Sequence, residues 1–493
     1  MTQPRPYGSA CRRYREIVKK LSLPLLGALV VALVATSSAA AFTPTNAYYS
    51  KQWYLGMDSA FDAWSIAPTF TPPVKVAIVD SGIDCSLPDL DTQIARVKSF
   101  VGGNACNDVQ GHGTIVAGEI AGALDQAGVV GIAYSSHLLV AKVVANDGTI
   151  PLKAEAAGIR WAVDQGARVV NLSFGAVRDP KQRSLDSYSK VEAQAVAYAV
   201  KKGAVVVAAV GNSDEAYTTP WPYASWPAAL PHVLGVGALT RAGNVPDFSD
   251  QDPFFVDITA PGVGIFSTYP KDLTNAQPDC SEQGYTDCAI GDYRHPEGTS
   301  FSAPQVSAAA AVLFGQDPQL TNSQVTRILE RHADDVNASN GCDECPDGRD
   351  KYSGWGSLDV TKAVNFLESG NTLPPSDRLE PNDSLSQARK VWGRRPAFDA
   401  TLDYWDDHVD VYRVRLVRGQ RLHVKVVAGW ANASVALTFL SLPGQPERVA
   451  RTAHAGRMQQ LSYPAPHTGW YAVKLRIVRH GGGRYALHLT KSG

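Results

Sequence analysis

Apolar and polar positions change their spacing repeatedly along the middle of the chain. Stretches with apolar residues at helical spacing lie at 152–165 and 191–202, and Gly203 follows the second. Between them lie short apolar runs typical of strands buried on both faces, at residues 74–79, 138–144, 168–172, 204–210 and 233–236. Alternating strands and helices predict a parallel sheet with helices on both faces. We therefore expect a three-layer α/β domain with its chemistry at the carboxyl ends of the strands.

A different pattern begins near residue 377. Residues 411–416 and 422–427 alternate between apolar and polar side chains, and glycine-containing turns separate such segments. This alternation is typical of strands that bury one face, and it predicts a small all-β sandwich over residues 377–493. The Pro- and Ser-containing segment 369–376 predicts a linker between the sandwich and an α/β domain over residues 42–368.

The N-terminal segment has the features of a targeting sequence. Basic residues up to Lys20 precede an uncharged stretch from Leu21 to Ala35, and a run of small residues ends at Ala41. This order predicts a secretory signal peptide over residues 1–41, because the apolar stretch is shorter than the ~20 residues of a membrane span. We expect secretion to the extracellular space or the cell envelope, with no stable membrane insertion after signal cleavage. An uncleaved membrane anchor is the alternative.

Composition and charge narrow the class of protein further. The chain has 493 residues, of which 44% are hydrophobic and 19% charged. These values are typical of globular domains, and they exclude fibrous, disordered and multi-span membrane proteins. The formal net charge of −1 gives no reason to expect a nucleic-acid partner. Residues 371–493 alone carry eighteen basic and nine acidic side chains, so the predicted sandwich is positively charged.

The cysteines predict disulfide bonds. Cys11 lies in the predicted signal peptide, which leaves an even number, as expected for an exported protein with three disulfides. Six cysteines allow 15 pairings. Proximity in the sequence favours three of these pairs: Cys85 with Cys106, Cys280 with Cys288, and Cys342 with Cys345. A zinc site at the last pair is the alternative, but it would need a second pair of ligands, and none is obvious nearby in the sequence.

Three residues carry unusual chemistry for their positions. Asp80 directly follows an apolar run, His112 stands between glycines before a small-residue helical stretch, and Ser300 stands before an Ala-rich one. Each alone would be an ordinary cap or turn residue. Together they supply a nucleophile, a base and an acid that orients the base, which are the three roles that acyl transfer requires.

In these segments the sequence resembles the subtilase family of serine proteases. The three motifs are Val79-Asp80-Ser81-Gly82-Ile83-Asp84, Gly111-His112-Gly113-Thr114 and Gly298-Thr299-Ser300-Phe301-Ser302-Ala303-Pro304. They follow the order Asp, His, Ser of subtilisin. The resemblance covers about residues 45–368, with a thermitase-like start at 48–53. It implies a secreted, monomeric serine endopeptidase for protein or peptide substrates. Asp80 would orient His112, His112 would be the general base and acid, and Ser300 would form the acyl-enzyme.

The resemblance also implies a substrate site. The segments 171–175 and 208–212 match the two walls of the family's specificity pocket, so Ser173, Phe174, Gly175 and Gly211 would contact an extended substrate. Asn212 matches the family's oxyanion-hole asparagine, whose amide donates to the developing oxyanion together with the backbone N–H of the nucleophile.

The family's chemistry needs no cofactor, but its members bind structural calcium. Asp89 and Asp125 match two positions of the calcium site by spacing, and their oxygen atoms suit Ca²⁺. Ala47 stands where some relatives offer an acidic ligand. Solvated surface carboxylates are the alternative interpretation of Asp89 and Asp125.

Two residues depart from the pattern of the subtilase family. Phe301 and Gln305 stand where relatives commonly carry Met and His. Segments 380–384, 410–412 and 418–420 resemble the bacterial pre-peptidase C-terminal domain.

Two other functions are the alternatives to a protease. A catalytically silent adhesin would need none of the proposed site residues. A lipase or esterase would need a Gly-x-Ser-x-Gly elbow, which the Ser300 segment lacks.

Overall fold

The computed structural model describes residues 42–493 except for short gaps, and these described residues belong to one compact unit, Ala41–Gly493. The gaps are 214–215, 277–285, 288–290, 374–376, 381, 386, 405–406, 431, 443–446 and 480. The predicted signal peptide, including Cys11, and the predicted Cys280–Cys288 bond lie outside the described residues.

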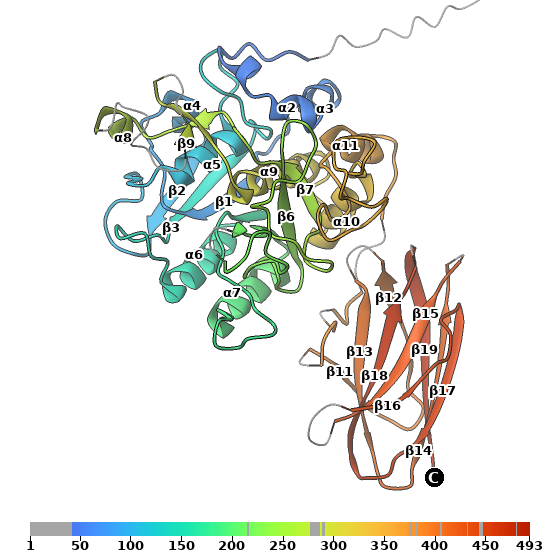
Figure 1. Cartoon of the computed structure of the whole chain (residues 1–493). Helices are drawn as coiled ribbons and strands as arrows, with labels where there is room; N and C mark the ends of the chain where they lie inside the picture. Colours follow the sequence, from blue (N-terminus) through green and yellow to red (C-terminus); the bar gives the residue numbers. More distant parts are fainter. Residues whose placement is uncertain are drawn as a thin grey trace, which may run out of the picture. The chain divides into compact units, whose positions relative to one another are not determined.

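A seven-stranded parallel sheet is the centre of the α/β part of the chain (Figure 1). Its strands lie in the order β2, β3, β1, β4, β5, β6, β7, so the strand order reverses at β1. Their bounds are β1 Lys75–Asp80, β2 Ile94–Ser99, β3 His137–Lys142, β4 Val169–Leu172, β5 Val205–Ala209, β6 Val233–Leu239 and β7 Ile258–Pro261. Ligands of open α/β sheets bind outside the strand ends at such a reversal.

Successive strand residues enter two separate cores, as the pleat of a β-strand requires. Val76 and Val207 pack into the first core, whereas their neighbours Ala77 and Val206 pack into the second. The second core lies under α6 (Leu152–Asp164) and α7 (Lys190–Lys201). Both faces of the sheet are therefore covered, which explains why the strands are apolar throughout.

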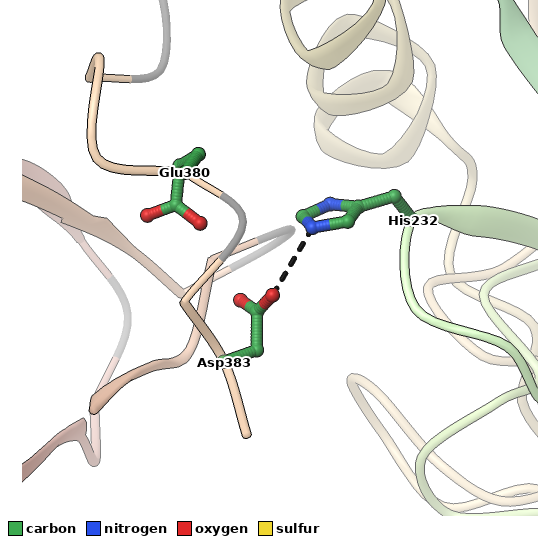
Figure 2. Close-up of side chains that lie close together, drawn as sticks. All are labelled: His232, Glu380 and Asp383. Carbon is green, nitrogen blue, oxygen red and sulfur yellow. Dashed lines mark hydrogen bonds and ion pairs between the residues drawn. The ribbon is translucent and has the colours of Figure 1, made fainter. Parts of the chain in front are cut away.

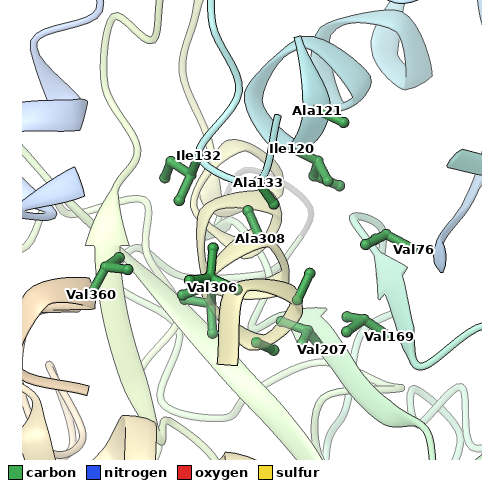
Figure 3. Packing of buried hydrophobic residues seen from close by; sticks show 14 of the residues in the cluster. Val76, Ile120, Ala121, Ile132, Ala133, Val169, Val207, Val306, Ala308 and Val360 are labelled. Atoms are coloured by element: carbon green, nitrogen blue, oxygen red, sulfur yellow. The ribbon is translucent and has the colours of Figure 1, made fainter. Parts of the chain in front are cut away.

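The first core lies under the remaining large helices. Figure 3 shows Val76, Val169 and Val207 of the sheet beside side chains of three of these helices. The helices and turns on this side are η1 Tyr49–Lys51, α2 Tyr54–Met57, α3 Ala60–Ile66, α5 His112–Ala121, η4 Thr299–Phe301, α9 Ala303–Gln316, α10 Asn322–His332 and α11 Val360–Glu368. Helix α9 is buried along nearly its whole length, which its Ala-rich sequence permits.

Smaller elements lie at the loops of the α/β part. These are α4 Pro88–Asp91, α8 Lys271–Ala276 and three short strands, β8 Ser267–Thr268, β9 Thr286–Asp287 and β10 Tyr293–Pro296. Disulfides join Cys85 to Cys106 and Cys342 to Cys345, which confirms two of the three predicted pairs. The described residues contain no helix with the length and apolar character needed to cross a membrane.

The C-terminal part is a β-sandwich, as the alternating pattern predicts. One sheet has the order β11, β13, β18, β15, β16, and the other has the order β12, β19, β14, β17. Their bounds are β11 Arg389–Val391, β12 Ala397–Asp403, β13 Val409–Leu416, β14 Arg421–Ala428, β15 Val435–Ser441, β16 Glu447–Arg451, β17 Met458–Pro464, β18 Gly469–Ile477 and β19 Gly482–Ser492. Alternate residues such as Tyr412, Val414, Val424 and Val426 fill the core between the sheets.

The segment expected to be a linker begins later than predicted. Leu373 is buried in the first core, and its carbonyl oxygen accepts a hydrogen bond from the side chain of Gln324 on α10. The chain therefore stays packed on the α/β part beyond Glu368. Arg327 and Arg331 of α10 also donate to the Asp403 carboxylate of β12, at 3.0 and 2.7 Å.

Candidate active site

Asp80 is the last residue of β1, at the reversal of strand order. It is 1% exposed, and one of its carboxylate oxygens accepts the backbone N–H of Ser81 at 2.7 Å. A buried carboxylate needs such partners because desolvation disfavours its charged form.

His112 is the first residue of α5, and its imidazole lies against Asp80. Its Nδ1 is 2.8 Å from Asp80 Oδ1 and 3.0 Å from Oδ2, so Nδ1 carries the proton and Nε2 is left as the basic nitrogen. Gly113 permits this approach, because a Cβ at Gly113 would lie 2.2 Å from the carbonyl oxygen of Gly82. Ser81 Oγ accepts the Gly113 N–H at 2.9 Å and fixes the start of the helix beside β1.

Asp108 positions the same helix end, and the sequence analysis did not identify it. Its carboxylate accepts the N–H of Gly111 at 2.9 Å, and the N–H and hydroxyl of Thr114 at 3.0 and 2.7 Å. These bonds satisfy N–H groups that a helix start leaves without partners. The signal in the sequence that could have identified Asp108 is its position as an acidic residue four positions before His112.

Ser300 lies in the short turn η4 that precedes α9, not on the helix itself. Its Oγ donates to the carbonyl oxygen of Ser173 at 2.8 Å. The ring of the next residue, Phe301, lies 5.2 Å from the His112 ring between centroids. The structure therefore brings the three motifs together at one edge of the sheet. Gly298 begins this turn at φ 137, a conformation that side chains other than glycine rarely adopt.

Asn212 follows β5 and is held by the Ser300 turn. Its Oδ1 accepts the N–H and the hydroxyl of Thr299, at 3.0 and 3.1 Å. Its Nδ2 lies beside Gly298, where an added Cβ would approach it to 3.3 Å. Since the oxygen end is fixed, the amide presents its N–H groups next to the Ser300 turn.

The two predicted walls follow neighbouring parallel strands. Ser173, Phe174 and Gly175 follow β4, and Gly211 follows β5, which pairs with β4. Gly211 has φ +108, and a Cβ there would lie 2.3 Å from the buried carboxylate of Asp250. Asp250 is therefore a neighbour of this wall that sequence reasoning missed.

A buried chain of hydrogen bonds joins the first wall to α9. Ser307 Oγ donates to Asn171 Oδ1 at 2.8 Å, Asn171 Nδ2 donates to Ser173 Oγ at 2.8 Å, and Ser173 Oγ donates to the Ser300 carbonyl oxygen at 2.6 Å. Asn171 and Ser307 thus position the two segments that meet at Ser300.

Asn46 and Asp89 contact one loop whose carbonyl oxygens converge in a set that fits a cation. The Nδ2 of Asn46 lies within 2.5–2.9 Å of the carbonyl oxygens of Ala123, Ala127 and Val129. An amide nitrogen has two hydrogens, so it cannot satisfy three acceptors. The Asn46 Oδ1 is buried without a recorded partner among the described residues, and exchanging the two amide atoms would place it among these carbonyls.

The carboxylates are close to the same loop. Burial raises the pKa of Asp89, and the charge of Asp125 raises it further. A Cβ at Gly128 would lie 2.0 Å from an Asp89 oxygen, so the loop follows the carboxylate closely. Asn46, and not its neighbour Ala47, is the N-terminal residue whose side chain enters this site.

A second group of possible metal ligands lies away from the active site. Figure 2 shows His232 and Asp383 pointing toward each other, with Nε2 and Oδ2 3.1 Å apart, and Glu380 nearby. One ligand atom from each of these residues lies within 4.8 Å of the others, and the same holds for Asp377, Glu380 and Asp410. The buried Oδ1 of Asp410 has no recorded partner among the described residues. These oxygens could hold a hard divalent cation.

Gln305 has a defined partner. Its Nε2 donates to Glu119 Oε2 at 3.0 Å, which links α9 to α5 inside the first core. Burial raises the pKa of Glu119 well above its usual range, since it disfavours the charged form of the carboxyl. Gln305, which stands where relatives commonly carry His, thus contributes to the packing of α9 against α5.

Comparisons with known proteins agree with this geometry. The sequence model of the subtilase family matches residues 72–356. The chain is 30% identical over 330 residues to the thermophilic serine proteinase of Bacillus sp. strain AK1, covering 66% of this chain and 70% of that protein. It is 36% identical over 268 residues to subtilisin BL of Lederbergia lenta, covering 54% of this chain and 86% of that protein.

A solved structure shares the fold. A protease from Pseudoalteromonas arctica aligns with a TM-score of 0.53 and 23% identity, over 66% of this chain and 99% of that one. The parallel sheet with an Asp–His pair at its reversal point therefore belongs to an α/β serine peptidase. The chain is a member of the subtilase family, a subtilisin-like serine endopeptidase whose substrates are peptides and proteins.

Proposed function

We propose that Asp80, His112 and Ser300 hydrolyse the peptide bond through an acyl-enzyme. His112 Nε2 accepts the Ser300 hydroxyl proton as Oγ attacks the carbonyl carbon, and it then donates this proton to the leaving amine. A water molecule enters next; His112 accepts its proton, the hydroxide attacks the ester, and the proton returns to Ser300 Oγ. Asp80 holds the Nδ1–H tautomer and stabilises the imidazolium that forms in each half.

The observation that carries this proposal is the Asp80–His112 pair. Asp80 lies 2.8 Å from Nδ1, so the other ring nitrogen is the one that can accept a proton. The contact between the His112 and Phe301 rings supports a position of that imidazole beside the Ser300 turn. A surface histidine that served only as a helix start would not need a buried carboxylate as its partner.

Asn212 and the backbone N–H of Ser300 form the oxyanion hole in this proposal. The Asn212 oxygen is held by two bonds from Thr299, so its Nδ2 is already oriented before substrate binds. Donors that are fixed in advance stabilise the developing charge without reorganisation.

Substrate binds as an added strand along the two walls. The backbone after β4, at Ser173 to Gly175, supplies one edge, and Gly211 supplies the other. The absence of a side chain at Gly211 leaves room between the wall and Asp250.

A structural calcium ion binds at Asp89, with the three converging carbonyls and Asn46. Asp125, whose charge acts on Asp89, adds negative charge to the same loop. Such a set of hard oxygen donors is typical of Ca²⁺ sites. The ion would supply stability to the N-terminal segment and the loop, and no step of the chemistry.

The protein is secreted and has two domains in this proposal: the peptidase domain and a β-sandwich resembling the pre-peptidase C-terminal domain. The two disulfides support an oxidising compartment. They also agree with the signal-peptide pattern of residues 1–41.

The test is Ser300→Ala. It removes the nucleophile with a minimal change in volume, so peptide turnover should fall by several orders of magnitude while the melting temperature stays unchanged. Ser339→Ala, at an exposed serine, is the matched control and should keep full activity. Substantial turnover by Ser300→Ala would refute the assignment of the nucleophile.

A further inference from the structure

The outer surface of the five-stranded sheet in the sandwich is positively charged. Strand register decides which side chains share that surface, because residues directly opposite each other point to the same face. Arg415 lies opposite Trp470, Thr438 lies opposite both Lys474 and Arg451, and Leu440 lies opposite Arg448. Their neighbours Tyr412 and Val414 are buried in the core, so these side chains point outward.

We name this surface the basic face. It consists of Lys390, Arg415, Arg448, Arg451, Lys474 and Arg476. All of them except Lys474 are exposed. Among the described residues of these five strands, no outward position carries Asp or Glu. Within the same described part, none of the six forms a recorded ion pair with a carboxylate. The positive charge of this face is therefore not neutralised by its own strands.

Electrostatic crowding appears on the face itself. Burial lowers the pKa of Lys474, and the positive charge of Arg476 lowers it further. Like charges placed close together cost free energy in the free protein, and a bound anion would relieve that cost.

The opposite sheet of the sandwich provides an internal comparison. Its outward positions include Arg421, Lys425 and Arg484, but they also carry the acidic Asp399. Mixed side chains of this kind are typical of an ordinary soluble surface. Among the described outward strand positions of the two sheets, only those of the basic face carry cations without a carboxylate.

An aromatic pair lies at one end of the basic face. The rings of Trp392 and Trp470 meet edge to face with centroids 5.4 Å apart, and Lys390 Nζ lies 5.6 Å from the Trp470 ring centroid. Trp392 is 66% exposed. Large exposed aromatic side chains beside cations are typical of ligand-binding surfaces.

We propose that the basic face binds an acidic polysaccharide, a polymer of sugars that carry carboxylate or sulfate groups. The cations would pair with the anionic groups along the polymer, and the tryptophan pair would pack against the apolar face of one sugar ring. This function goes beyond the proposed peptidase chemistry. It would hold the enzyme on an anionic matrix while the active site remains free to cleave proteins.

The arrangement of the aromatic side chains favours a polysaccharide over a nucleic acid. Proteins that bind single strands place aromatic side chains along the groove, so that successive bases stack on them. Here the two tryptophans contact each other at one end, and among the described outward strand positions of the face Trp470 is the only aromatic one. Positive charges extend over the basic face, whereas aromatic rings on which a sugar or base could stack lie at the end formed by Trp392 and Trp470.

The test measures binding of the full chain to polygalacturonate, with neutral dextran as the uncharged probe. We expect binding to polygalacturonate that weakens as salt rises from 50 to 300 mM, and no binding to dextran. The triple variant Arg415→Gln, Arg451→Gln, Arg476→Gln should bind at least about tenfold more weakly, a loss of about 1.4 kcal/mol. The triple variant Arg421→Gln, Lys425→Gln, Arg484→Gln removes the same charge from the other sheet, and it should lose less than about threefold.

A further variant separates stacking from charge. Trp392→Ala should weaken binding while leaving its salt dependence unchanged, because no charge is removed. Peptide turnover should be normal in every variant, so a failure of this proposal is distinguishable from a failure of the proposed chemistry. Equal losses in the two triple variants would overturn the proposal. So would tighter binding to a single-stranded oligonucleotide or to anionic lipid vesicles than to polygalacturonate.

Discussion

Ser173 and Ser300 are joined by two reciprocal hydrogen bonds. Ser300 Oγ donates to the Ser173 carbonyl oxygen at 2.8 Å, and Ser173 Oγ donates to the Ser300 carbonyl oxygen at 2.6 Å. The first residue follows β4 and the second precedes α9, so the pair fixes the proposed nucleophile against the substrate wall. Precise placement of this kind contributes to the rate because small displacements of reacting groups are costly.

Ser173→Ala should therefore lower kcat with little change in KM. It removes two hydrogen bonds of Ser173 Oγ, one from Asn171 Nδ2 and one to the Ser300 carbonyl oxygen. The bond to Ser300 contributes about 0.5–1.5 kcal/mol, equivalent to about a two- to tenfold lower rate. Steady-state kinetics on a short peptide is the measurement. Ser189→Ala, which removes the N-cap of α7, is the control and should lower stability without changing kcat. An unchanged kcat in Ser173→Ala would show that the pair does not position Ser300.

Asn212→Ala should reduce kcat about 10²- to 10³-fold at nearly constant KM, a magnitude that comes from subtilisin itself. The substitution removes a donor that acts mainly in the transition state. Asn322→Ala is the matched control, because its Nδ2 donates to the carbonyls of Val200 and Ala204 and only joins structural segments. A rise in KM with normal kcat would instead assign Asn212 to ground-state binding.

Removal of calcium should lower the melting temperature. At a calcium concentration about 100 times its Kd, the bound ion adds about 2.7 kcal/mol, equivalent to about 4 °C for a domain of this size. Asn46→Ala and Asp89→Asn should each reduce this increment, whereas Asp91→Asn, on the same short helix, should retain it.

These variants also show which site holds the stabilising ion. A chelator alone cannot show this, because it would equally remove an ion from the separate group of carboxylates that includes Glu380 and Asp410. If calcium still raised the melting temperature of Asp89→Asn fully but no longer raised that of Asp410→Asn, the stabilising ion would lie in the sandwich. That result would contradict the proposed calcium site.

The pH dependence of stability should reflect two facing carboxyls, Glu155 of α6 and Glu192 of α7. Burial, with the neighbouring charge of Glu192, raises the pKa of Glu155 to about 9, and burial raises that of Glu192 to about 7. A raised pKa in the folded state means that stability is complete below the ordinary value of 4.5 and is lost as pH rises through about 7 and 9.

Glu155→Gln should lessen this loss, because its amide has no charge to desolvate. We expect its advantage over the unmodified protein to grow by at least about 1 kcal/mol between pH 6 and pH 9, roughly the value of one pKa unit. Denaturant unfolding at both pH values is the measurement. Glu297→Gln is a control for removing a carboxylate elsewhere. A constant difference between the two pH values would contradict the buried pair.

Much of the fold could be predicted from the sequence because its sheet is buried on both faces. Apolar runs such as 204–210 cannot be surface segments, and the structure confirms a strand there as β5. Strand β2 was missed since it lies at the sheet edge, where Arg96 and Lys98 interrupt the apolar pattern. Helix α10 was missed as well, although Thr321 and Gln324 form a capping box at its start.

The site could be predicted only where its residues form short motifs. Asp80, His112 and Ser300 stand in such motifs, and the structure gathers them at one sheet edge. Asp108 was missed although its bonds to Gly111 and Thr114 are local, because no motif includes it. Asn171 accepts a hydrogen bond from Ser307, far away in the sequence, which spacing does not reveal. The basic face was invisible for the same reason, because strands that are distant in the sequence contribute its cations.

The most direct test of the account is covalent labelling of Ser300. A serine-directed phosphonylating reagent reacts with a hydroxyl only where a base activates it. We predict one adduct per chain, found by peptide mass analysis on the segment that contains Ser300, with labelling abolished in Ser300→Ala and strongly slowed in His112→Ala. An adduct on another serine, or labelling that persists in Ser300→Ala, would contradict the assignment of Ser300 as the nucleophile.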